Sequence, residues 1–516
     1  MVRGVRMSPV DTTWLRMDRP TNPMVIVGVI GLSGAVDPVE LERLLAERLL
    51  AYRRFRQKAE ARPGGMWWVD DRHFDVSRHI HHVRLPGAGG EAELEHFVGE
   101  LATTPLDHAV PLWQFHIVEG YSGGAAVVVR IHHAIADGIA LIGVMLSLTD
   151  DLAGVDEPVA HWTAGADAEH GDGWAGLFAP ISKAVRAGTK LSGRALKTSN
   201  SLLSHPTRAL GLVRDGVGIA SELAGLLFMP NDSRTPLKGV PRGVKKVAWA
   251  DPLPLAEVKA VAHALGCSVN DVLMSCVAGA FNAHLAAEGQ RTRGVEIRAL
   301  IPVNLRAPGR HADLGNEFGI VTLVLPVGID DPLARLAEVR RRMDELKASH
   351  QAAVTYGLLA VLGYTPKQAQ DALFSILLSR ATAVMTNVPG PQTRLTMAGA
   401  EVSRMMFWVP QSGDIGIGVS ILSYAGEVQF GLITDAALVP EPRRIIDQFR
   451  PQFERLLYTT LLEFADHAAD LVEAGRTASR PAPRHRRRDT TAPGRTASRP
   501  KAAKGETRRD GRTDRP

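Results

Sequence analysis

Short apolar runs bounded by turn residues are the main pattern in the first third of the chain. Met24–Leu32, Pro111–Gly120 and Ala125–His132 are rich in apolar and β-branched residues, which is typical of buried strands. YSGG joins the last two runs, so we expect a tight hairpin there. The apolar run Ile139–Leu148 follows an Asp–Gly pair, which predicts a helix with Asp137 as its N-cap. This part of the chain is therefore predicted to be α/β.

The second half of the chain shows the same mixture of patterns. Leu255–Leu265 and Val269–His284 have apolar residues at helical spacing, whereas Gly319–Val327 and Gly416–Thr434 are predicted to form strands. Ala425–Gly426 interrupts the last run as a two-residue turn. The sequence therefore predicts α/β structure twice.

A basic segment, Trp174–Arg214, separates the two halves and contains seven Lys/Arg and no Asp or Glu. Five of its basic residues recur at spacings of three and four, so they share one helix face. They are Lys183, Arg186, Lys190, Arg194 and Lys197. One interpretation is an amphipathic helix that lies on a membrane interface. The other is a solvated crossover helix between domains.

Charge is distributed unevenly along the chain. The tail, Arg476–Pro516, has 14 Lys/Arg and 4 Asp/Glu, which is a net charge of +10. The whole chain has a net charge of +5, so the remainder has a net charge of −5. The tail has almost no large apolar residue and repeats GRTASRP, so we expect it to be disordered. Three interpretations are open: attraction to an anionic membrane surface, a solvated tail without a partner and, least favoured, nucleic-acid binding.

A chain of 516 residues is too long for one compact core, so we expect two domains with accessory segments. The predicted boundaries are 1–165 and 241–475 for two α/β domains, 166–240 for the basic crossover and 476–516 for the tail. No apolar run approaches the roughly 20 residues that span a bilayer. The first residues also lack the apolar region of a signal peptide. We therefore expect a cytoplasmic protein.

Two patterns that resemble metal sites have simpler interpretations. Cys267 and Cys276 lack CxxC or His spacing and are predicted to be buried, inert thiols. His79, His81 and His82 have no Asp, Glu or Cys at ligand spacing, so we interpret them as surface histidines. The sequence therefore predicts no metal.

GYSGG at 120–124 matches the GxSxG pattern of a hydrolase nucleophile elbow, with Ser122 as the nucleophile. The elbow requires strand, turn and helix in that order, and here a second strand follows, so a hairpin turn is favoured. The sequence also lacks a P-loop and GxGxxG, and so gives no support to nucleotide chemistry.

The stretch RIHHAIADGIAL has a coherent context that the other patterns lack. A strand delivers His132 and His133, whose side chains must point to opposite sides if strand geometry persists. One of them can then face a cavity while the other packs. Asp137 and Gly138 are predicted to shape the following turn, the first as a cap and the second through a conformation closed to other residues. A structural histidine at a capped turn explains this pair but not two adjacent histidines.

HHxxxDG at His132–Gly138 is the motif of the CoA-dependent acyltransferases. Further stretches in family order narrow the resemblance, so the chain resembles the bacterial wax ester synthase/diacylglycerol O-acyltransferases. The stretches are MSPVDTTWLRMDRPTNPM, FRQK, WWVDD, PLDHAVPLWQFHIVEG, SVNDVLMSCVAGA, IPVNLR, LGNEFG, TNVPGP and SYAGEVQFGLITD. They cover roughly residues 7–470. One departure is Val25, where the resemblance leads us to expect His.

The resemblance implies two chloramphenicol-acetyltransferase-like domains with the active histidine in a tunnel at their interface. It also implies that His133 is the catalytic base and His132 its supporting neighbour. Asp137 and Gly138 are expected to be structural. Asn270 of the ND motif is the candidate for substrate binding, as a hydrogen-bond donor to the developing oxyanion.

Neighbouring motif residues have packing interpretations. Asp271 is expected to be structural, and SVND can also be read as Ser268 capping the helix that follows. Pro111–Trp113 is expected to pack around the site.

The implied activity is that of an acyl-CoA:diacylglycerol O-acyltransferase that forms triacylglycerol, with wax ester synthesis on long-chain alcohols as an alternative. Acyl-CoA is a co-substrate, and no cofactor is expected. The expected location is the inner face of the membrane or a lipid-droplet surface. Two other functions stay open. A catalytically silent lipid-droplet protein is disfavoured by the intact HHxxxDG, and a condensation-type enzyme by the lack of an adjoining carrier domain.

Overall fold

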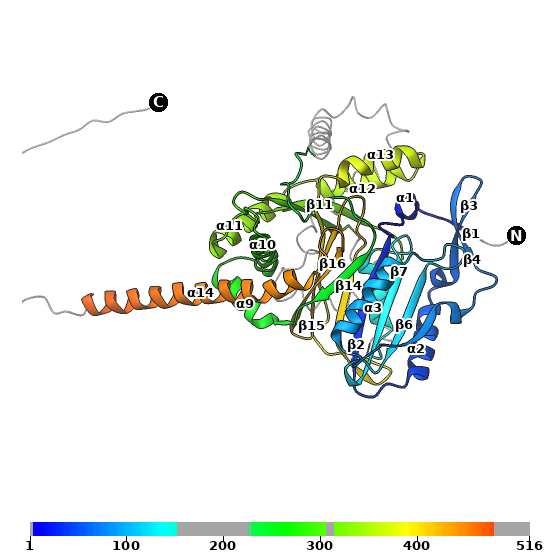
Figure 1. Cartoon of the computed structure of the whole chain (residues 1–516), viewed down its shortest axis with the longest axis horizontal. Coiled ribbons are helices and arrows are strands. Elements are labelled where there is room, and N and C mark those ends of the chain that lie inside the picture. The colour runs from blue at the N-terminus through cyan, green and yellow to red at the C-terminus, as the bar shows by residue number, and fades with distance from the viewer. Residues whose placement is uncertain (1–3, 152–224, 226–228, 306–313, 479–516) are drawn as a thin grey trace, which may run out of the picture. The chain divides into compact units, whose positions relative to one another are not determined.

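The structure is a computed structural model that describes residues 4–151, 225, 229–305 and 314–478 (Figure 1). The basic segment Trp174–Arg214, most of the predicted crossover and nearly all of the predicted tail lie outside the described residues, so their interpretations stay predictions. Residues up to Leu462 form one compact unit, which contains both sheets described below.

The first sheet is built around β7 (Ala125–His132), with the strand order β13-β14-β2-β7-β6-β5. Its other strands are β2 (Val25–Ser33), β5 (Ile80–Arg84), β6 (Trp113–Glu119), β13 (Thr396–Met397) and β14 (Ala400–Trp408). Every residue of β7 is buried, in line with its place in the middle of the sheet. The turn Tyr121–Gly123 joins β6 to the antiparallel β7, so the hairpin is confirmed. Ser122 precedes a strand, which does not fit a nucleophile elbow.

Helices and a small sheet complete this half of the chain. The helices are α1 (Pro9–Met17), α2 (Pro38–Leu50), α3 (Glu91–Thr103) and α4 (Gly138–Ser147), with short 3₁₀ turns at Arg53–Arg56 and Val76–Arg78. The strands of the small sheet, in the order β1-β4-β3, are β1 (Gly4–Arg6), β3 (Gln57–Arg62) and β4 (Gly65–Asp70). The helix α1 begins because Ser8 caps the backbone N–H of Asp11 and proline occupies its first position. It is important for the site because it buries Asp11 and Trp14.

The second sheet has the strand order β11-β10-β12-β15-β16-β8, with β9 paired to β16. The strands are β8 (Lys245–Trp249), β9 (Leu253–Pro254), β10 (Ile297–Asn304), β11 (Phe318–Leu325), β12 (Ala383–Pro389), β15 (Ile417–Tyr424) and β16 (Glu427–Asp435). The helices are α9 (Leu255–Ala264), α10 (Val269–Ala287), α11 (Pro332–Lys347), α12 (Gln351–Leu362), α13 (Lys367–Leu378) and α14 (Arg443–Ala478). The predicted turn between β15 and β16 is confirmed. Ala425 and Gly426 both have positive φ, as a type I′ hairpin requires.

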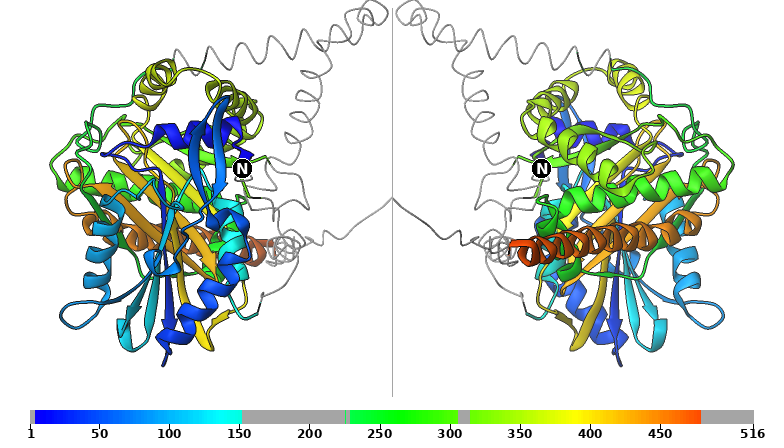
Figure 2. Two further views of the ribbon diagram at one scale, coloured as in Figure 1. Left: turned by 90° about the vertical axis from the view of Figure 1, so that its right-hand side faces the viewer. Right: turned by 90° about the vertical axis from the view of Figure 1, so that its left-hand side faces the viewer.

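One segment of the second half lies in the sheet of the first. β14 pairs antiparallel with β2, from Trp408 opposite Val27 to Glu401 opposite Ser33. Figures 1 and 2 show β14, in yellow, beside the blue β2. The division of the sequence at residue 241 is therefore not a division between the two sheets in space.

Two predictions about burial are corrected. His79 is buried rather than on the surface, because its ring stacks on Trp113 at 4.5 Å and its Nδ1–H donates to the Trp113 carbonyl oxygen at 2.8 Å. Cys267 is partly exposed, whereas Cys276 is buried as predicted. Burial raises the pKa of the Cys276 thiol to about 12, which makes that thiol unreactive at neutral pH.

Candidate active site

His132 and His133 stand at the end of β7 and continue its alternation. The His132 N–H donates to the Leu112 carbonyl oxygen on one side (2.9 Å), and the His133 N–H donates to the Met24 carbonyl oxygen on the other (2.7 Å). Successive side chains of an extended chain point to opposite faces. The two imidazoles therefore enter different environments, although both are buried.

His133 faces an apolar pocket. The imidazole stacks on Trp14, with ring centroids 4.3 Å apart. It also lies beside the tilted ring of Phe318, with ring centroids 5.4 Å apart. The residues that line the pocket come from both halves of the chain. They are Trp14, Met17, His133, Leu300, Pro302, Phe318, Ile320, Leu359, Phe374, Leu378, Val384, Val409, Pro410, Ser412 and Ile415. The imidazole and the Ser412 hydroxyl are thus placed in an otherwise apolar space between the two sheets.

Asn316 fixes the tautomer of His133. The Asn316 side-chain amide donates to the His133 carbonyl oxygen (2.9 Å) and to Asp11 Oδ1 (2.8 Å). Both of these partners accept hydrogen bonds, so the amide nitrogen must face them, and Asn316 Oδ1 must face His133 Nδ1 at 2.9 Å. An amide oxygen only accepts, so Nδ1 carries the proton. Nε2 of the neutral ring is then the basic nitrogen.

Asp137 joins the HHxxxDG turn to the loop that carries Asn316. Asp137 Oδ1 accepts from the Ala140 N–H (3.0 Å) and caps α4, which confirms the predicted cap. Asp137 Oδ2 accepts from the Glu317 N–H (3.0 Å), and the Asp137 N–H donates to the Gly315 carbonyl oxygen (3.1 Å). The carboxylate therefore joins the start of α4, in the first half of the chain, to the Asn316 loop, in the second half, next to His133.

Gly138 differs from its prediction. It occupies the first position of α4, outside the left-handed region, and a Cβ added there would meet no atom within 4 Å. The conformational reason expected for this glycine is therefore absent.

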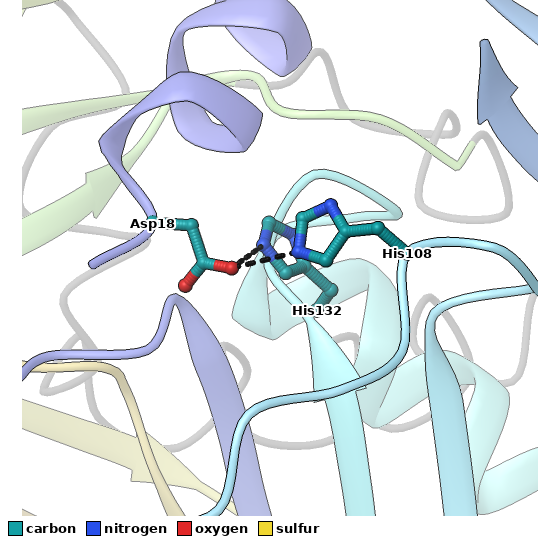
Figure 3. A group of neighbouring side chains, drawn as sticks. All are labelled: Asp18, His108 and His132. Atoms are coloured by element: carbon teal, nitrogen blue, oxygen red, sulfur yellow. Dashed lines mark hydrogen bonds and ion pairs between the residues drawn. The ribbon is translucent and has the colours of Figure 1, made fainter. Parts of the chain in front are cut away.

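His132 lies in a second polar group, with Asp18 and His108 (Figure 3). The two Nε2 atoms approach the same carboxylate oxygen, at 2.9 Å for His108 and 3.6 Å for His132. The second distance is slightly too long for a hydrogen bond. Val25, where the expected histidine is missing, is the β2 residue paired with His132.

The group of Asp18, His108 and His132 is the one set of three potential metal ligands within the described residues. The Ala134 backbone N–H donates to His132 Nδ1 at 3.1 Å, so that nitrogen must carry the lone pair. The proton of neutral His132 is then on Nε2, which cannot bind a metal in that state. We interpret the group as a protonated Nε2 directed at a carboxylate. This contact holds His132 in place and orients the loop that carries Asp18. Asp18 Oδ1 also accepts from the Met24 N–H (2.7 Å).

Asn270 is placed away from His133. It is not among the residues that line the pocket, and its Oδ1 accepts from the Asn387 side chain on β12. Successive residues of β12 point to opposite faces of the sheet. Val384 faces the pocket, whereas Ala383 and Met385 face the core on the other side. Asn387 is on the same face as Ala383 and Met385, away from the pocket. The substrate contact of Asn270 stays a prediction.

Other residues of the predicted motifs have structural contacts. Ser268 accepts from the Asp271 N–H (3.2 Å) while Asp271 accepts from the Ser268 N–H (2.9 Å), so this pair caps α10. Trp113 is fully buried and its Nε1–H donates to the Phe55 carbonyl oxygen (2.8 Å). Trp113 packs against Phe55 and His79 and does not line the His133 pocket, so its packing around the site stays a prediction.

Two family models match the chain. The wax ester synthase/diacylglycerol acyltransferase catalytic domain matches residues 7–273, and the WS/DGAT C-terminal domain matches residues 314–457. The first match alone covers more than half of the chain.

The chain belongs to the wax ester synthase/diacylglycerol acyltransferase family.

Individual comparisons agree with this family and with its fold. The Mycobacterium tuberculosis protein named "Probable diacyglycerol O-acyltransferase tgs1" is 28% identical over 421 residues, which is 80% of this chain and 86% of that protein. The Marinobacter aquaeolei VT8 wax ester synthase/diacylglycerol acyltransferase has a TM-score of 0.60 at 19% identity, over 88% of this chain and 100% of that one. A starter condensation domain of rhizomide synthetase, solved with C8-CoA, has a TM-score of 0.52 at 11% identity, over 89% and 95%. The fold expectation is confirmed.

Sequence reasoning missed three residues that the structure places at or next to His133. Asn316, Asp11 and Trp14 were given no role, although the first lies in LGNEFG and the other two lie in MSPVDTTW. The available signal was a polar residue close to a turn residue, as for Asn316 after Gly315 and Asp11 near Pro9. Asn316 reaches His133 and Asp11 only when the two halves pack together, whereas Trp14 stacks on His133 within the first half.

The burial of His133 predicts how activity depends on pH if this imidazole is the base. Burial lowers the pKa of His133 to about 4. A lowered pKa means that the neutral, basic form persists until the pH falls through about 4, so the acid limb of kcat/KM is expected near that pH and not near 6.5. The measurement is kcat/KM against pH, with circular dichroism at each point to verify folding. An acid limb between about pH 6 and 7 in folded protein would contradict the buried neutral base.

Proposed function

We propose that this chain transfers a fatty acyl group from its CoA thioester to the hydroxyl of diacylglycerol, with a long-chain alcohol as the alternative acceptor and His133 as the base. The observation that carries the proposal is the fixed tautomer of His133, which directs a basic Nε2 into an apolar pocket. The names of the relatives and the CoA-bound condensation domain support the same substrates.

In the proposed reaction, His133 moves one proton twice. Nε2 takes the acceptor's hydroxyl proton as the hydroxyl oxygen attacks the thioester carbon. The tetrahedral intermediate then collapses, the carbon–sulfur bond breaks, and the imidazolium returns the proton to the CoA thiolate. Asn316 Oδ1 accepts the Nδ1–H in every step and so keeps Nε2 directed at the reacting atoms. His132 stays outside this path because its Nε2 faces Asp18.

The pocket suits alkyl chains better than polar acceptors. Its walls are almost entirely apolar side chains, so an acyl or alkyl chain is stabilised there by burial at about 25 cal/mol per Å². A polar acceptor or a carrier-bound peptide would leave polar groups unpaired. This favours lipid substrates over the condensation-type alternative.

We also propose a peripheral location, on the inner face of the membrane or on lipid droplets, because the acceptors partition there. Among the described residues, no single helix is long and apolar enough to cross a bilayer. Only the bent pair α9 and α10 passes such a test together.

An assay of the purified full chain with labelled palmitoyl-CoA tests the proposal. Diacylglycerol and hexadecanol are offered separately, and labelled triacylglycerol or wax ester is measured by thin-layer chromatography. We expect ester formation with at least one acceptor, and the ratio of kcat/KM values assigns the preferred one. If neither lipid is esterified, the proposal fails and the silent lipid-binding protein becomes the better interpretation.

A further inference from the structure

The helices α12 and α13 each have one face in the His133 pocket. Leu359 of α12 lines that pocket together with Phe374 and Leu378 of α13. The turn between them is tied to the end of α1, because Arg16 donates to the Thr365 carbonyl oxygen (3.0 Å). The two helices are therefore a wall of the site.

The opposite faces of these helices and the turn between them expose large apolar side chains. Val361, Tyr364 and Ile376 are 61%, 73% and 46% exposed. From Gln351 to Pro366 the sequence contains no Asp, Glu, Lys or Arg, whereas the preceding helix α11 carries charged residues in every turn. A solvated helix normally presents polar and charged side chains outward. The outer face of α12 and α13 is thus unusual for a surface in contact with water.

A second cavity connects this wall to the surface. It shares Met17, Phe374, Leu378 and Ser412 with the His133 pocket. Its remaining lining residues are Arg19, Asp371, Ser375, Gly413 and Asp414.

An ion pair between Arg19 and Asp371, at 3.2 Å, joins the residues after α1 to α13 across this cavity. Both side chains are partly exposed, so the pair is weak enough to open. Lys367, exposed at the start of α13, adds a cation next to the apolar face.

We infer that the outer face of α12 and α13 rests on a lipid surface, and that the lipid acceptor reaches His133 through the cavity between Arg19 and α13. The inference rests on the proposed function for the acceptor. Lys367, together with Arg19 once its ion pair with Asp371 opens, matches anionic headgroups. Obligate dimers bury large, core-like apolar interfaces, and three exposed apolar side chains are too few to form one, which argues against a second copy of the chain.

The test is a full-length variant with Val361→Glu, Tyr364→Ser and Ile376→Glu combined. These side chains are exposed and do not line the pocket, so folding is expected to be retained. Cosedimentation with phosphatidylcholine vesicles that contain phosphatidylglycerol and diacylglycerol is expected to fall about tenfold or more. Esterification of vesicle-borne diacylglycerol is expected to fall with it, while esterification of dissolved 1-butanol stays unchanged.

The matched control is Val39→Glu, Val240→Glu and Val244→Glu combined, which changes three exposed valines outside α12 and α13. The control is expected to bind vesicles like the unmodified chain. Unchanged vesicle binding of the α12–α13 variant, or an equal loss with both acceptors, would overturn the inference. If the unmodified chain esterifies no acceptor, the proposed function fails, while the vesicle measurement still decides whether this face binds lipid.

Discussion

Replacing His133 with alanine is expected to lower kcat by about 10²–10⁴-fold, because a positioned base contributes that much to proton transfer. KM for acyl-CoA is expected to change little, since the pocket keeps its other walls. The variant leaves a space on the face of Trp14 where the imidazole had stacked, next to Phe318. Added imidazole is therefore expected to restore part of the activity. The measurement is kcat and KM with and without imidazole.

His116→Ala is the matched control for the loss of a buried imidazole. His116 is also buried, lies on β6 and does not line the pocket. Its variant is expected to keep kcat within a few-fold of the unmodified chain. If His133→Ala retains more than about a tenth of kcat, or both variants lose activity equally, His133 is not the base.

Replacing Asn316 with leucine is expected to be the second most damaging change to the site. The variant removes the acceptor of the His133 Nδ1–H and leaves buried Asp11 without its amide partner. We expect kcat to fall about 10–100-fold with little change in KM, as for other residues that orient a catalytic group. We also expect the free energy of unfolding to fall by about 1–3 kcal/mol, because a buried acceptor loses its hydrogen bond. Both are measured on the same purified protein.

Asn316→Asp distinguishes an orienting role from a purely structural one. The aspartate keeps an acceptor for the Nδ1–H, so this variant is expected to be more active than the leucine variant. Its carboxylate also favours the protonated imidazolium, which raises the pKa of His133 and moves the acid limb of kcat/KM upward from about 4. An unmoved acid limb would show that Asn316 acts only through folding. Asn316→Asp places a carboxylate against Asp11, so this variant is expected to be less stable. Adding Asp11→Asn is expected to restore part of the stability, because the amide at position 11 can donate to the carboxylate at position 316.

Local features of the site were predictable because they depend on short stretches of sequence. The strand Ala125–His132, the hairpin before it and the cap at Asp137 follow from periodicity, turn residues and the preference of Asp for helix starts. The opposite directions of His132 and His133 follow from strand geometry alone. The reason given for Gly138 failed because helical backbone, not a left-handed turn, follows Asp137.

The remaining features depend on contacts between distant segments. Asn316 is 183 residues from His133 and 305 from Asp11, and β14 enters a sheet whose other long strands precede it by more than 250 residues. Periodicity describes which face of an element is apolar but not which other element covers it. His79 is an example, because its burial depends on stacking with Trp113 of the next strand.

The sequence by itself determined the fold class, the strand that delivers two histidines and the motif that relates the chain to acyltransferases. The tertiary structure decided which histidine faces the pocket, which tautomer it holds and what lines the path to it. The physical reason is that a proton's position on a ring is set by the groups that hydrogen-bond to the other nitrogen. Here Asn316 sets it for His133 and the Ala134 N–H sets it for His132, in opposite senses.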